Sequence, residues 1–320
     1  MLMPTYEELK RRSDVPPGSS WGLLGDLGTI GRLTPEIKRA AIRAVQTGET
    51  FNLDWPINAF DPPPSPTRHL ARHHIFQRNP NHRDDYLDSF YLQSTTQIDG
   101  LRHHRHAEAG FYNFAKDEEI RAGSGPIGIE QWADFGIVGR GVLIDVERYL
   151  THSRGRGLDH HTGEAFSAEI LDQALAWQEI ELREADILLI RTGWAGFYFR
   201  ELTQEQRQAL PGDNYSPGLE QSEKSLTWLW DSRAAMVASD NIGVEALPVV
   251  EGSPFLSIDP TGMMHQSMIA LLGLALGELW RLEELADACH ADGRYDMLVV
   301  CKPLSIMGGV GSPANAMAIR

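Results

Sequence analysis

The sequence has little cysteine, no excess of positive charge and no long hydrophobic run. Only Cys289 and Cys301 occur among 320 residues, so neither a disulfide framework nor a paired-cysteine zinc site is expected, and a reducing, cytoplasmic location is the default. Lysine and arginine total 29 against 44 acidic residues, and the net charge of −15 disfavours nucleic acid and anionic membranes as partners. The longest apolar run, residues 268–277, is about half of a membrane span, and residues 1–17 lack the apolar core of a signal peptide.

Several catalytic motifs are also missing. The chain contains no His-Glu-x-x-His, no Gly-x-Ser-x-Gly and no Gly-x-x-x-x-Gly-Lys-Ser/Thr sequence. Zincins, serine hydrolases with a nucleophile elbow and P-loop enzymes are therefore excluded. The length and a hydrophobic content of 42% indicate instead a globular protein with a sizeable core.

Apolar periodicity predicts strands that alternate with helices. Buried strands are expected at residues 141–146, 186–191, 234–239 and 297–301, and helices at residues 34–48, 167–182 and 265–288. This alternation is typical of an α/β fold. The last helix would carry both His265 and Glu278, and the proline-rich residues 61–83 are expected to form a surface excursion.

Imidazole and carboxylate groups are concentrated in residues 97–106, which hold three of the twelve histidines. In an extended chain Gln97, Asp99 and His103 would project to one face. A carboxylate with imidazoles is a suitable ligand set for zinc or manganese. The alternative is a polar loop of solvated histidines, some of them paired with Asp99.

The segment from Gln93 to His103 resembles the motif His-x-Gly-Thr-His-x-Asp-x-Pro-x-His of the cyclase family, which includes bacterial kynurenine formamidases and isatin hydrolases. Further matching blocks lie at residues 21–25, 139–145, 186–194, 238–245 and 308–313. The Thr-Gln-x-Asp-Gly variant and the length resemble the longer branch of the family. The resemblance implies one domain over residues 1–320 of the swivelling β/β/α type, with residues 1–65 as an N-terminal extension packed on it, and a homo-oligomer.

The resemblance also implies roles for single residues. Asp99, His265 and Glu278 would bind a divalent metal ion, zinc or manganese, and His103 would transfer a proton. As the second catalytic residue, Gln97 would position the water or give an oxygen ligand. Glutamine stands at positions 93 and 97 where the family motif has histidine, and an amide oxygen is a weaker ligand for zinc. We expect the substrate to contact Gln93, His104 and Trp194.

Asp99, His103 and Glu278 each have a structural interpretation as well. Asp99 precedes a glycine and could cap a turn, and His103 could be one exposed histidine among several. Glu278 interrupts an apolar stretch and could pair with Arg281 or Arg102, although a metal ion would offset its burial directly.

The function that these residues predict is hydrolysis of a small-molecule amide, lactone or ester by metal-activated water. A cyclase or dehydratase of secondary metabolism uses the same activated carbonyl and is the nearest alternative. A metal-poor binding protein that has lost catalysis is a further alternative, because two expected histidines are replaced.

Overall fold

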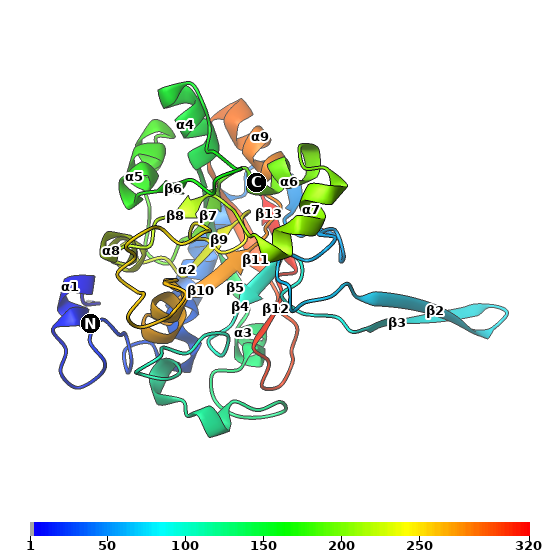
Figure 1. The fold of residues 1–320 in the computed structure, drawn as a ribbon, viewed down its shortest axis with the longest axis horizontal. Helices are drawn as coiled ribbons and strands as arrows, with labels where there is room; N and C mark the ends of the chain where they lie inside the picture. The colour runs from blue at the N-terminus through cyan, green and yellow to red at the C-terminus, as the bar shows by residue number, and fades with distance from the viewer. Residues whose placement is uncertain (1–2) are drawn as a thin grey trace.

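A nine-stranded mixed sheet runs through the centre of the molecule in this computed structural model, which describes residues 3–320 (Figure 1). Its strand order is β1-β13-β11-β5-β7-β9-β10-β4-β12. In this order the strands span Thr50–Asn52, Ala316–Ile319, Asp296–Cys301, Ile137–Asp145, Ile187–Arg191, Met236–Ser239, Ala275–Glu278, Gln97–Asp99 and Gly311–Pro313. The four central strands β5, β7, β9 and β10 are parallel, whereas every pairing outside them is antiparallel.

Helices surround this sheet, with α5 packed on β5 and α4 on β7. The α-helices α1 to α9 span Tyr6–Lys10, Pro35–Ala41, Ile129–Phe135, Val146–Arg154, Ala168–Trp177, Trp194–Arg200, Gln204–Ala209, Glu223–Asp231 and Glu283–Asp292. Two small sheets pair β2 (Arg72–Asn79) with β3 (His82–Asp88) and β6 (Ala165–Phe166) with β8 (Gly218–Leu219). Among the described residues no helix combines the length and the apolar character that a membrane span requires.

The α/β class predicted from periodicity is confirmed. Strands β5, β7, β9 and β11 lie where continuous apolar runs predicted them, and β7 and β9 are buried along their whole length. Helix α2 begins as expected, because the Thr34 hydroxyl accepts a hydrogen bond from Ile37 N and Pro35 occupies the first turn. It continues into a short 3-10 helix, Ile42–Ala44.

The predicted long helix over residues 265–288 is wrong. The segment forms a π-helix, Gln266–Leu271 (η6), then strand β10, and only later helix α9. Gly273, with a φ of 65°, ends the helical turn, and its carbonyl accepts a hydrogen bond from Thr29 N at 2.8 Å. Apolar residues are buried on all sides here, so their spacing did not distinguish a helix from a strand.

The proline-rich excursion leads into a β-hairpin formed by β2 and β3. Figure 1 shows this hairpin extending away from the body of the molecule. Its side chains are mostly exposed, with Ile75 at 67%. The start of the excursion, at Pro64, Pro66 and Arg68, instead lines a cavity beside the sheet.

The N-terminal segment packs along the domain and joins its sheet. Helix α1 contacts α8, and the Pro4 carbonyl accepts hydrogen bonds from Trp230 Nε1 and Arg233 Nη1. Strand β1 then pairs with β13 at the sheet edge.

Candidate metal centre

Three elements that are adjacent in the fold bring Asp99, His265 and Glu278 together. Asp99 ends β4 and Glu278 ends β10, and these strands pair antiparallel with Glu278 opposite Gln97. His265 immediately precedes the π-helix. One ligand atom from each of the three residues lies within 4.8 Å of the other two, and all three side chains are buried. The pairing register of β4 and β10, which cannot be read from the sequence, places Asp99 and Glu278 close to each other.

The Asp99 carboxylate has no hydrogen-bond partner among the described residues, although it is completely buried. Its Oδ2 lies 3.6 Å from Nε2 of His103. Burial raises the pKa of Asp99, and the charge of His103 opposes this rise only in part. The buried Gln97 Oε1 also lacks a partner. Unpartnered buried acceptors are costly, and a divalent cation would satisfy them, so the residues present fit a metal ion.

His265 is held between two carboxylates. Its Nδ1 lies 2.5 Å from Glu245 Oε1 and its Nε2 lies 2.9 Å from Glu278 Oε1. Burial lowers the pKa of His265, but these carboxylates outweigh it and hold the pKa well above its ordinary value. A carboxylate on Nδ1 fixes the tautomer that presents Nε2 to a metal, which is the usual arrangement for histidine ligands.

Glu245 was not among the residues predicted for the site. Its carboxylate accepts hydrogen bonds from Met264 N and Gln221 Nε2, each at 2.8 Å. Two distant segments of the chain, around residues 221 and 264, therefore hold it in position. Its place in the matching block of residues 238–245 was the one available signal. Gln97 has a comparable position on the other side, because its amide nitrogen donates to Glu278 Oε2.

A cavity of about 280 Å³ opens in front of these residues, and Gln97, His103, His104 and Arg68 line it. The ring of His104 lies 4.8 Å from that of His103 and 5.2 Å from that of His265. Burial lowers the pKa of His103, and burial with the charge of the other two histidines lowers that of His104 to about 3. Both rings are therefore neutral at physiological pH, and His103 is the one of the two that could serve as a proton acceptor.

The structure brings six of the eight predicted site residues together: Gln97, Asp99, His103, His104, His265 and Glu278. Trp194 and Gln93, predicted as substrate contacts, are not among the residues that line this cavity. Trp194 is fully buried against Phe60, and its indole donates to Tyr215 O at 3.0 Å. The Gln93 amide lies instead against Gly311 on the neighbouring strand β12.

The structural alternatives for Asp99 and Glu278 do not hold. Asp99 lies in a strand and caps no turn. Arg281 pairs with Glu284, not with Glu278. The guanidinium of Arg102 donates to four backbone carbonyls, of Pro126, Arg121, Gly308 and Ser124.

The molecule is thus an α/β protein with a mixed sheet, in which two strand ends and the start of the π-helix bring a buried Asp-His-Glu set together as a candidate metal centre. The family model described as "Putative cyclase" matches residues 36–246, which is more than half of the chain. The chain therefore belongs to the cyclase family.

Solved structures agree with this assignment. A crystal structure described as a novel cyclase is 32% identical, with a TM-score of 0.80 over 94% of this chain and 99% of that chain. Isatin hydrolase A from Labrenzia aggregata, bound to benzyl benzoate, is 16% identical, with a TM-score of 0.55 over 84% and 93%. Isatin hydrolase A from Ralstonia solanacearum is 14% identical, with a TM-score of 0.56 over 85% and 92%. The two hydrolases share the fold. No curated protein matches the chain.

Proposed function

We propose that this chain is a metal-dependent hydrolase of a small-molecule amide, lactone or ester. The observation that carries the proposal is the buried Asp99 carboxylate, which lacks a partner and lies beside His265 and Glu278. Asp99, His265 and Glu278 would hold a divalent ion. When bound, such an ion lowers the pKa of water and polarises a carbonyl.

The residues around the centre have separate positioning roles. Glu245 fixes the ring of His265, and Gln97 fixes the carboxylate of Glu278 by donating to Oε2. Both contacts hold the ligand atoms before any ion arrives, which limits the reorganisation that binding requires. The interpretation of Gln97 as an amide donor also accounts for a glutamine at a position where the family motif has histidine.

His103 is the proton-transfer residue of the proposal. Its ring is neutral, lines the cavity and is 3.6 Å from Asp99, so Nε2 can take a proton from water and return it to the leaving group. Arg68 is the only lysine or arginine among the described residues that line the cavity. Its guanidinium would bind the substrate carbonyl oxygen or the carboxylate of the product.

The cavity limits the substrate to a small molecule, because about 280 Å³ is at the lower end of ligand pockets. Isatin hydrolases share the fold, so cyclic amides are the first class to test. A homo-oligomer and a cytoplasmic location remain predictions, and light scattering would measure the first.

The experiment is a hydrolysis screen with protein loaded with zinc or manganese. Isatin, an arylformamide and an aryl lactone would be tested with wild type, Glu278→Gln and the control Glu251→Gln, which changes an exposed carboxylate. We expect turnover that a chelator abolishes and that Glu278→Gln lacks, with folding retained by circular dichroism. Binding without turnover of any panel member would favour the binding-protein alternative.

A further inference from the structure

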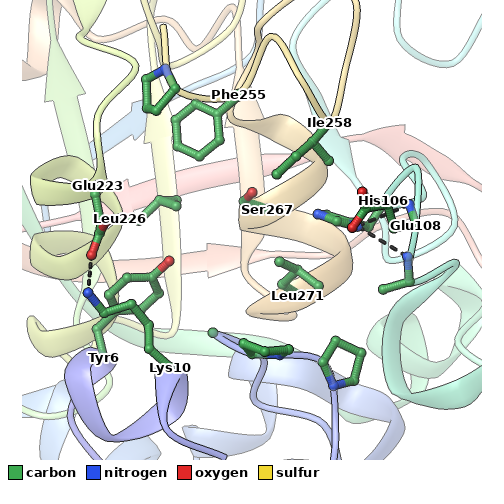
Figure 2. Close-up of a pocket in the computed structure, with 15 residues that line it drawn as sticks. Tyr6, Lys10, His106, Glu108, Glu223, Leu226, Phe255, Ile258, Ser267 and Leu271 are labelled. Carbon is green, nitrogen blue, oxygen red and sulfur yellow. Dashed lines mark hydrogen bonds and ion pairs between the residues drawn. The ribbon is translucent and has the colours of Figure 1, made fainter.

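A second cavity, of about 710 Å³, lies on another side of the π-helix η6 (Figure 2). It shares no lining residue with the candidate metal centre. Its walls come from α1, α8, the loop around Phe255, the segment after His106 and the π-helix itself. The volume is within the range of pockets that bind drug-sized molecules.

The lining of this cavity is mainly apolar. Figure 2 shows Phe255 and Ile258 near the upper end of the π-helix, Leu226 at one side, and Leu271 at the lower end of the helix. Phe255 is 6% exposed and Leu226 2% exposed, so their side chains are fixed by the core on one side and face the cavity on the other. A molecule that fills this space would remove apolar surface from water, which favours an apolar ligand.

Among the neutral polar side-chain groups in the lining, the hydroxyls of Ser267 and Tyr6 and Nε2 of His106 make no hydrogen bond with any described residue. Glu108 N and Ala109 N donate to His106 Nδ1 at 3.3 and 3.2 Å. Nδ1 is therefore an acceptor and Nε2 carries the hydrogen. In Figure 2 these two bonds leave one side of the ring, and the other ring nitrogen is turned toward the helix that carries Ser267. His106 and Ser267 thus offer hydrogen-bond donors on an apolar wall.

The charge around the cavity selects against anions. Lys10 pairs with both Glu7 and Glu223, and Glu108 has no basic partner among the described residues. Of the charged side chains that line the cavity, one ammonium and two carboxylates, Lys10 with Glu108 and Glu223, give a net charge of −1. An anionic ligand would meet this negative potential and lose its hydration in an apolar cavity.

We propose that this cavity is a second small-molecule site, for an uncharged and largely apolar molecule whose carbonyl oxygen accepts hydrogen bonds from His106 and Ser267. The apolar walls supply the affinity, and the two donors orient the molecule. The site is separate from the metal centre and does not require the proposed hydrolase activity.

The test uses benzophenone, which is uncharged, apolar and has one carbonyl, in equilibrium dialysis with the full chain. Diphenylmethane lacks the acceptor, and 4-benzoylbenzoate adds a negative charge. We expect one saturable benzophenone site per chain, and each of the other two probes to bind about tenfold more weakly or worse. Ser267→Ala should weaken benzophenone binding several-fold and leave diphenylmethane unchanged.

The variants locate the site. Ile258→Trp fills the cavity and should weaken benzophenone binding by about tenfold or more. Leu256→Trp is the matched control, because Leu256 is 50% exposed on the same loop and does not line the cavity. Asp99→Asn should leave benzophenone binding unchanged, which separates this site from the metal centre. Melting temperatures would verify that each variant is folded.

Three results would overturn the proposal. Benzophenone binding that survives Ile258→Trp but is lost in Asp99→Asn would place the probe in the metal-centre cavity. Equal affinity for 4-benzoylbenzoate would contradict the charge selection. A change of molar mass in light scattering caused by Ile258→Trp without a probe would assign the cavity to a contact between copies of the chain.

Discussion

Glu245→Gln tests how the metal centre is positioned. The substitution keeps the size of the side chain and an oxygen that can accept from Met264 N and Gln221 Nε2. It removes the negative charge 2.5 Å from His265 Nδ1. The imidazole then loses its strongest orienting partner and becomes less basic, so His265 is a weaker ligand.

Loss of such a carboxylate partner typically lowers metal affinity by about 10- to 100-fold, which corresponds to about 1.4–2.7 kcal/mol. We expect a value within this range because His265 is 3% exposed, so water does not readily replace the lost partner. Glu278 still faces Nε2 at 2.9 Å and keeps the ring in the site, which makes complete loss of binding unexpected.

The assay is zinc competition against a chromophoric chelator at fixed pH, with wild type, Glu245→Gln and Glu251→Gln. Glu251 is exposed and lies six residues further along the chain, so its variant controls for the loss of one negative charge. An unchanged zinc affinity in Glu245→Gln, with normal folding, would refute the positioning role of Glu245.

Three further predictions concern single residues. His103→Gln should lower kcat by about 100-fold or more while the metal content stays at the wild-type level, because His103 transfers the proton and is not a ligand. Burial raises the pKa of Asp54 to about 6, against the hydrogen bond from Ala316 N. The folded state binds the proton more tightly than the unfolded state, so ionisation of Asp54 destabilises the wild-type protein above about pH 6. Asp54→Asn should therefore be more stable than wild type above pH 6, by about 1–3 kcal/mol, and this gain should vanish below about pH 4. Gly277→Ala should destabilise the protein by about 1–3 kcal/mol or more, because the new Cβ would lie 2.7 Å from that of Ala238.

Each of these predictions has a result that contradicts it. Metal loss in His103→Gln would make His103 a ligand. If urea unfolding shows the same gain in stability for Asp54→Asn at pH 4 and at pH 7.5, the gain does not come from the ionisation of Asp54. A wild-type melting temperature in Gly277→Ala would mean that strand β10 has room beside it.

The central strands and the site residues from Gln97 to His103 could be predicted from the sequence, because they depend on local patterns. Continuous apolar runs predicted β7 and β9, and the alternation of Gln97 and Asp99 in an extended segment placed both on one face. His103 also reaches the cavity, although a turn at Gly100 carries it there.

Features that depend on distant contacts were not predictable in the same way. Residues 265–280 are buried on every side, so their composition does not distinguish a helix from a strand. Gly273 ends the helical turn, and pairing with β4 makes the next segment a strand. Glu245 reaches His265 only through the fold, over twenty residues of separation. Trp194 lies in a matching block but faces a separate aromatic cluster with Phe60 and Tyr198.

The most direct test of the metal centre is elemental analysis of protein purified without added metal or chelator. Wild type would be compared with Asp99→Ala and with Asp84→Ala, which changes a partly exposed carboxylate of the β2–β3 hairpin, away from the centre. We predict close to one zinc or manganese per chain in wild type and in Asp84→Ala, and almost none in Asp99→Ala. Wild-type protein that holds no metal, even after incubation with zinc and manganese, would contradict the account.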